Sequence, residues 1–146
     1  MLKDDQYYEL DEEIISYVKK IELEFGFAID IKYKYITNNK QKTMIQIKKI
    51  PDNYAVLLNS ELLVSVNDEY FSKFDEEIRT ILISQEFDKI HINFDKGTFK
   101  ISQPTLKTSV GLIKRYSYDK IERANESERL LSESKLQSEN EDKLNK

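Results

Sequence analysis

The side chains best suited to catalysis or metal binding lie together in one short segment, which runs from Ser84 to His91. It contains two carboxylates, Glu86 and Asp88, together with Lys89 and the single histidine of the chain. A carboxylate held near a reacting group can act as a general base, and a histidine can do the same or bind a metal. The alternative is the end of an ordinary amphipathic helix with a solvated polar tip, and the residue types alone favour this alternative.

The residue counts exclude several kinds of active site before any fold is considered. The chain has no cysteine, which rules out thiolate zinc sites, iron–sulfur clusters and cysteine nucleophiles. With one histidine, a metal site with two or three histidines cannot be built within one chain, and a Ser–His–Asp triad could use only His91. A metal would have to rest on carboxylates, which favour magnesium, calcium or manganese over zinc.

His91 does not extend a ligand set formed by its neighbours. It follows Lys89 by two residues, and this offset turns it about 200° around a helix, onto a different face. We therefore expect His91 to be a surface residue or to lie in a turn.

Hydrophobic periodicity indicates the elements that must position this segment. Two runs of alternating apolar and charged residues are separated by a polar turn, so we expect them to form an antiparallel hairpin. In chain order, the expected elements are a helix over residues 7–25, the hairpin strands over 27–35 and 43–50, a short helix over 54–58, a strand over 62–66, a helix over 72–90, a strand over 98–101 and a short helix over 106–116.

The helix over residues 72–90 carries the segment, and Ser72 is its expected N-cap. The acidic run of residues 75–77 lies in its first turns, where the helix dipole explains it better than a cation site does. Gln85 and Lys89 extend the apolar stripe of this helix, so we expect both side chains to be partly buried.

The stretch from Leu82 to Ile90, together with the order of the elements, resembles the small zincin-like metallopeptidases of phages and prophages. In that family the helix carries the motif H-E-x-x-H, whose glutamate is the general base. A glycine-containing turn, a short strand and a third metal-binding histidine follow, and the last helix ends near a tyrosine. The resemblance covers roughly residues 1–120.

By this resemblance, Glu86 stands in place of the general base, Gln85 in place of the first histidine and Lys89 in place of the second. The resemblance therefore assigns these three residues to a vestigial site. The remaining counterparts are the turn at Asp95–Gly97, the end of the last helix at residues 112–116, and Pro104 and Thr105 at the third ligand and its acidic neighbour.

The chain departs from the family motif at the residues that would bind the metal ion. A catalytic zinc site needs three protein ligands and a water molecule. Gln85 is a poor zinc ligand, and Lys89 brings a positive charge to the place of the cation, where it could pair with Glu86 or Asp88. We therefore expect no metal, no cofactor and no catalytic residue in this chain.

The fold expected from these elements is α+β, with a small, mostly antiparallel sheet covered by helices, and the resemblance makes it zincin-like. Residues 1–118 form the single domain, and residues 119–146 form a charged C-terminal helix with a frayed tail. The sequence leaves open whether this helix packs on the domain through Ile121, Ala124 and Leu131 or binds a partner.

The leading interpretation of function is a non-catalytic phage or prophage protein that binds a host or phage protein. The first alternative is a residual hydrolase that uses Glu86. The weaker alternative is binding of single-stranded nucleic acid by the hairpin, although outward lysines and inward aromatics explain its pattern as well. The aromatic and basic residues of the hairpin are Lys32, Tyr33, Lys34, Tyr35, Lys48 and Lys49.

The net charge and the hydropathy of the chain restrict its expected partners and its expected location. The net charge of −4 and the isoelectric point of about 5.2 argue against a nucleic-acid partner. No stretch approaches the roughly 18 apolar residues of a membrane span, and the N-terminal residues do not resemble a signal peptide. We therefore expect no membrane association and a location in the host cell cytoplasm. The sequence does not indicate an oligomeric state.

Overall fold

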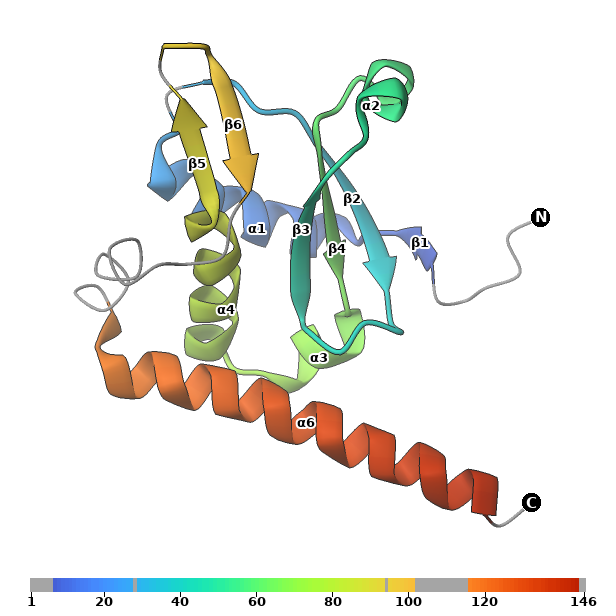
Figure 1. Cartoon of the computed structure of the whole chain (residues 1–146). Helices are drawn as coiled ribbons and strands as arrows, with labels where there is room; N and C mark the ends of the chain where they lie inside the picture. The colour runs from blue at the N-terminus through green and yellow to red at the C-terminus, as the bar shows by residue number, and fades with distance from the viewer. Residues whose placement is uncertain (1–6, 28, 94, 102–115, 145–146) are drawn as a thin grey trace.

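The computed structural model describes residues 7–27, 29–93, 95–101 and 116–144, and it has the expected α+β class (Figure 1). In chain order, the elements are β1 (Tyr7–Glu9), α1 (Glu12–Phe25), β2 (Tyr33–Asn38), β3 (Ile45–Lys49), α2 (Asp52–Leu58), β4 (Leu62–Val66), α3 (Asp68–Lys73), α4 (Glu76–Asp88), β5 (Ile90–Asn93), β6 (Thr98–Ile101) and α6 (Tyr118–Leu144). The short helix expected over residues 54–58 and the strands expected over 62–66 and 98–101 are confirmed as α2, β4 and β6.

The larger sheet has the strand order β1-β2-β4-β3. Strands β1 and β2 are antiparallel, as are β3 and β4, whereas β2 and β4 are parallel. The predicted hairpin of β2 with β3 is therefore wrong, because β4 lies between them. The reason is burial: Leu62, Val64 and Val66 are almost fully buried, so the most apolar strand takes the central position and the lysine-bearing strands flank it.

Three other boundaries differ from the sequence prediction. Residues 7–9 form an edge strand rather than the first turn of α1, which begins after its N-cap Asp11. Strand β2 begins at Tyr33 rather than at Phe27, because the ring of Phe27 stacks on Phe25 and contacts Phe87 instead of entering the sheet. His91 lies in strand β5, paired with β6, and not in a turn.

The predicted central helix is divided into α3 and α4. Phe74 adopts an extended conformation between them, and Asp75 caps α4 by accepting a hydrogen bond from the Ile78 N–H at 2.9 Å. Ser72 lies inside α3, so the prediction that it is the N-cap is wrong. A carboxylate followed by two further acids is a stronger start signal than a serine three residues earlier.

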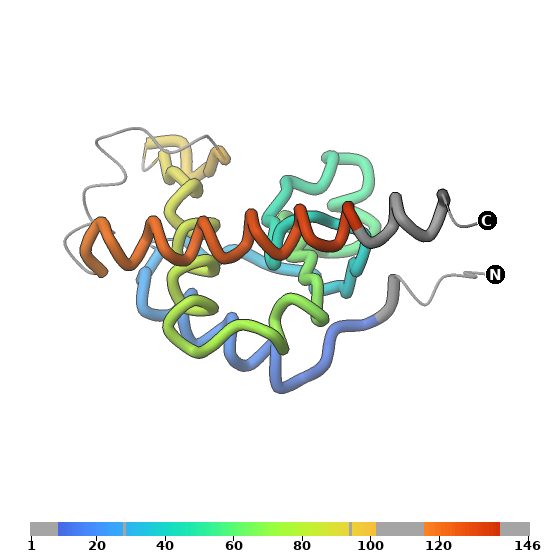
Figure 2. The backbone as a smooth tube through the Cα atoms, turned by 90° about the horizontal axis from the view of Figure 1, so that it is seen from below, coloured from blue at the N-terminus to red at the C-terminus, as the bar shows by residue number. Residues whose placement is uncertain are grey.

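The helices α1 and α4 pack against the larger sheet, and α6 passes below α4 and α3 as a long rod (Figures 1 and 2). Ala124 of α6 is fully buried in the main core, and Ile121 and Leu131 pack against the same core. Residues 121–131 of α6 are therefore packed on the domain. Among the described residues, none of the helices combines the length and the apolar character that crossing a bilayer requires.

Candidate functional site

The end of α4 lies beside the edge strand β3 and the middle of α6. Residues Ile81, Leu82 and Phe87 are buried and fix this end of the helix in the core. Gln85, Glu86 and Lys89 consequently face a polar hollow of about 250 Å³, which we call the Glu86 site. Its other walls come from β3 and the residues before it and from α6, through Thr43, Ile45, Gln46, Asn125 and Glu128.

Both carboxylate oxygens of Glu86 are engaged. One forms an ion pair with the ammonium group of Lys89, one helical turn later, and the other accepts a hydrogen bond from the Ile47 N–H at 3.2 Å. Strand β3 is at the edge of the sheet, so the Ile47 N–H is free to point toward α4. The side chains of Glu86 and Lys89 are 12% and 26% exposed, so this ion pair is largely removed from solvent.

A second carboxylate, Glu128, reaches the same site from α6. Its Oε2 accepts a hydrogen bond from the Met44 N–H at 2.7 Å. Burial raises the pKa of Glu128, and the charge of Glu86 raises this pKa further, whereas the Met44 N–H and the charge of Lys89 lower it. The site therefore holds one ammonium group, which pairs with Glu86, and a second carboxylate that comes from a different helix.

Glu128 was not predicted as a site residue, although its position in the sequence indicates a special role. It lies four residues after Ala124 and three before Leu131, on the apolar stripe that packs α6 on the domain. A charged residue in such a stripe must find polar partners when the stripe is buried. Here the partners are the Met44 N–H and the neighbouring Lys89.

The loop that presents Met44 is held by a buried amide network. Gln41 donates to the Ser65 carbonyl at 2.9 Å and accepts from the Ser65 hydroxyl at 2.7 Å. Asn67 donates to the Gln41 carbonyl at 3.0 Å. Because these side chains fix the chain before β3, the Met44 N–H has a defined direction toward α6.

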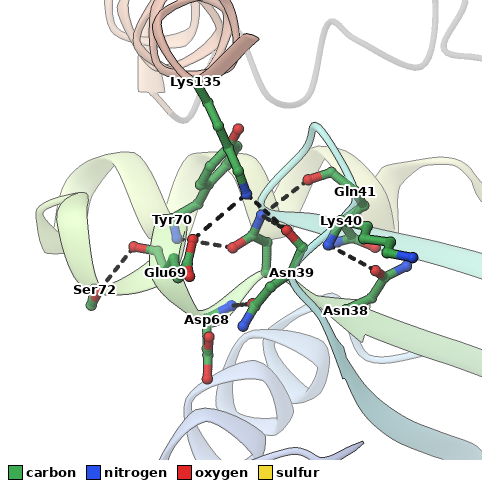
Figure 3. Close-up of polar contacts among 10 residues, drawn as sticks. Asn38, Asn39, Lys40, Gln41, Asp68, Glu69, Tyr70, Ser72 and Lys135 are labelled. Atoms are coloured by element: carbon green, nitrogen blue, oxygen red, sulfur yellow. Dashed lines mark hydrogen bonds and ion pairs between the residues drawn. The ribbon is translucent and has the colours of Figure 1, made fainter. Parts of the chain in front are cut away.

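The same loop meets α6 at a second point, further along the helix. The Lys135 ammonium donates to the Asn39 carbonyl at 2.9 Å and lies 3.6 Å from a carboxylate oxygen of Glu69 (Figure 3). It also lies 5.7 Å from the centre of the Tyr70 ring. The hydrogen bond of Lys135 and that of Glu128 together fix the position of α6 beside the Glu86 site.

Asp88 and His91 take no part in the Glu86 site, since neither lines the hollow. Burial raises the pKa of Asp88, and the nearby charge of His91 offsets only part of this rise. Of the two partners for Lys89 considered from the sequence, the ammonium group pairs with Glu86 and not with Asp88.

The donor set of the Glu86 site does not fit a zinc ion. A dication there would be repelled by the Lys89 ammonium, and Glu86 and Glu128 already accept hydrogen bonds from backbone N–H groups. Within residues 7–27, 29–93, 95–101 and 116–144, no three side chains of His, Cys, Asp or Glu come together as metal ligands do. Pro104 and Thr105 lie outside the described residues, as do residues 106–115 of the short helix expected over residues 106–116.

The tyrosines of β2 face the helices rather than open solvent. Tyr33 contacts Phe87 edge to face with ring centres 6.1 Å apart, and burial raises the pKa of Tyr35 to about 12. Lys32 and Lys34 are exposed on the other side of the strand. The alternating pattern is thus explained by packing, and the hairpin on which the nucleic-acid hypothesis rested is not formed.

Comparison with models of known families gives a match over most of the chain. The model of a family described as "Putative phage metallopeptidase" matches residues 1–134. The matched range includes Gln85, Glu86 and Lys89, and it extends along α6 beyond Glu128. No curated protein and no solved structure matches the chain.

Proposed function

Because the chain belongs to the family described as putative phage metallopeptidase, we propose that it is a non-catalytic member of this family that binds a host or phage protein. The observation that carries the proposal is the ion pair of Lys89 with Glu86, the residues that the resemblance aligns with the second histidine and the general base of the family's motif. An ammonium group in this place supplies the positive charge that a metal ion would supply, but it has no coordination position for water or substrate.

The state of Glu86 supports the same conclusion. A general base must lie within hydrogen-bonding distance of the proton that it removes. Each oxygen of Glu86 is instead directed at a group of the protein, one at the Lys89 ammonium and the other at the Ile47 N–H, and Glu128 lines the same site from α6. These contacts suit a carboxylate that joins the end of α4 to β3, which is a structural role.

The surface supports a binding function for such a protein. Several large apolar side chains are exposed, above all Leu23, Val56 and Leu57. A protein partner is the kind of ligand that such side chains suit. The acidic net charge argues against nucleic acid, and we place the protein in the host cell cytoplasm, away from membranes.

The test is metal content and hydrolysis, measured on the same preparation. The protein, purified without chelators and dialysed, should contain no stoichiometric zinc and should not cleave a quenched fluorescent peptide library, with or without added zinc. Glu86→Gln should be indistinguishable from the wild type in both measurements. One zinc per chain that survives dialysis, or peptide cleavage that Glu86→Gln abolishes, would establish the residual hydrolase instead.

A further inference from the structure

One edge of the larger sheet is covered over only part of its length. Strand β1 pairs with residues 36–38, at the end of β2, and its register stops at Ile36 (Figure 1). Among the described strands, none pairs with Tyr33, Lys34 or Tyr35 on this side of β2. Residues 33–35 therefore form an open sheet edge, which presents backbone N–H and C=O groups to another chain.

The direction of these backbone groups is fixed by the neighbouring strand. The Lys32 carbonyl accepts from the N–H groups of Glu61 and Leu62, at 2.9 and 3.2 Å, so it points toward β4. Successive residues of a strand direct their backbone groups to opposite sides. The N–H and C=O groups of Tyr33 and Tyr35 consequently point away from β4, to the open edge.

A groove lies beside this edge, between β2 and the second half of α1. Its volume is about 490 Å³, within the range of roughly 300–1,000 Å³ that ligand pockets have. Alternate side chains of a strand that pairs with the open edge would enter the groove, because they lie on the same face of the sheet as the tyrosines of β2. The apolar and aromatic walls of the groove come from Leu23, Phe27, Ile29, Ile31, Tyr33 and Tyr35.

Two carboxylates, those of Glu22 and Asp30, also line the groove. Glu22 accepts a hydrogen bond from the Tyr33 hydroxyl at 3.5 Å, so its partner in this bond is a neutral group. Burial raises the pKa of Glu22, which the hydrogen bond from Tyr33 lowers and the charge of Asp30 raises further. A cation that entered the groove would therefore stabilise the ionised form of Glu22.

Among the described residues that line the groove, Lys19 is the only cation. Its ammonium group lies 5.8 Å from the centre of the Tyr35 ring, which shows that a tyrosine of this groove can accept a positive charge. One ammonium against two carboxylates leaves the groove with a net negative charge. The groove thus offers a further cation both aromatic rings and carboxylates.

We infer that the protein partner adds an extended segment to the open edge of β2 and places an arginine or lysine side chain in the groove, beside Glu22 and Asp30. The inference rests on the proposed function and names the surface and the chemistry of its partner. Backbone hydrogen bonds to Tyr33 and Tyr35 would supply affinity, and the groove would supply the preference for a basic side chain.

Other occupants suit this surface less well. Nucleic acid or an anionic membrane would bring negative charge to the carboxylates of Glu22 and Asp30. A second copy of β2 at the same edge would bring its tyrosines to this face of the sheet, because the exposed Lys32 and Lys34 lie on the opposite face. An extended segment with a basic side chain satisfies both the edge and the groove.

NMR titration of the isotope-labelled full chain with synthetic peptides, at neutral pH, tests the inference. The probe is a blocked peptide, Thr-Val-Thr-Arg-Thr-Val-Thr, whose valines and arginine share one face when it is extended. Added up to about 1 mM, so that weak binding is also measured, it should shift the amide signals of Tyr33 and Tyr35 most. The same peptide with glutamate in place of arginine should bind at least about ten-fold more weakly, because its carboxylate meets Glu22 and Asp30.

Two variants should change the affinity for the arginine peptide in opposite directions, which misfolding cannot do. Glu22→Gln should weaken binding about ten-fold, because it removes a charged acceptor from the groove. Lys19→Gln should strengthen binding about two-fold or more, because it removes the competing cation. Glu13→Gln is the matched control, since Glu13 is an exposed glutamate of α1 that does not line the groove, and it should leave the affinity unchanged.

The inference would be overturned if the arginine peptide bound no better than the glutamate peptide, or if neither peptide bound over the whole range. An affinity that Glu22→Gln leaves unchanged would overturn it as well, as would shifts confined to residues outside β2 and the groove. None of these outcomes affects the zinc and hydrolysis test, since the Glu86 site shares no residue with the groove.

Discussion

Replacing Lys89 by methionine should reveal how the charges of the Glu86 site depend on one another. Methionine keeps most of the apolar stem and its packing, so the change removes little more than the ammonium group. Glu86, which is 12% exposed, and Glu128 then face each other without a cation. Replacing the charge of Glu86 instead, by Glu86→Gln, leaves Lys89 with Glu128 as a partner and leaves an oxygen for the Ile47 N–H.

The magnitude follows from the burial of the pair. Breaking a fully buried ion pair by removing one partner costs about 3–5 kcal/mol, and an exposed pair contributes about 0–1 kcal/mol. The Lys89 side chain is 26% exposed, so Lys89→Met should lower the free energy of unfolding by about 1–3 kcal/mol. Glu86→Gln should cost less than Lys89→Met, because only the lysine variant leaves two carboxylates together.

Urea denaturation at neutral pH, followed by circular dichroism, measures both variants and their combination. The double-mutant cycle should give a coupling free energy of about 1 kcal/mol or more. Lys120→Met is the matched control: its ion pair with Glu77 is 3.6 Å long and about half exposed, so its loss should change stability by less than about 0.5 kcal/mol. A coupling no larger than that of the control, or a Glu86→Gln variant less stable than Lys89→Met, would refute this account of the site.

Three further experiments address the site and the helix that closes it. Burial raises the pKa of Glu128, so its ionised form is disfavoured in the folded protein; Glu128→Gln should therefore be more stable than the wild type near pH 8, and urea midpoints should show this advantage shrink as the pH falls and the wild-type carboxyl becomes protonated. Gln85→His combined with Lys89→His should bind zinc only weakly by competition with a chromophoric chelator, and micromolar or tighter binding would show that a third protein ligand is present. Ala124→Leu should destabilise the protein by about 1–3 kcal/mol in the same urea assay, whereas Leu130→Ala on the exposed side of α6 should change stability by less than about 0.5 kcal/mol.

Local sequence patterns predicted most elements, because capping and periodicity act over a few residues. The helix predicted to end at residue 25 does so, because Gly26 follows it in the αL conformation, with φ of 58°. The error at Ser72 was also local: two adequate capping residues compete, and Asp75 caps α4 because Phe74 is buried in an extended conformation between the helices.

Strand order was not accessible from local patterns. Residues 27–50 contain two alternating strands joined by a polar turn, which is the pattern of a hairpin. The competing partner, β4, lies further along the chain, and its nearly complete burial decides the pairing. The pairing of strands depends on the free energy of the whole core, which cannot be evaluated from a short window of sequence.

The Glu86 site was only partly predictable for the same reason. Gln85, Glu86 and Lys89 lie on one helix, so their common side follows from their spacing. Glu128 lies 39 residues after Lys89 in the chain. It reaches the site because Ala124, on the same helix, packs in the core. A contact of this kind can be recognised in the sequence only as a charge that interrupts an apolar stripe.

The hydrogen bonds between α6 and the loop before β3 set the order in which the protein can be completed during synthesis. Met44 and Glu128 are separated by 84 residues, and Asn39 and Lys135 by 96. A ribosome releases the N-terminal part of a chain first, so the sheet can form while α6 is still being made. Until α6 emerges, the Met44 N–H and the Glu86 site remain open to water and to chaperones. The site can therefore close only after α6 has been made, and a factor that binds the nascent chain before then meets it in the open state.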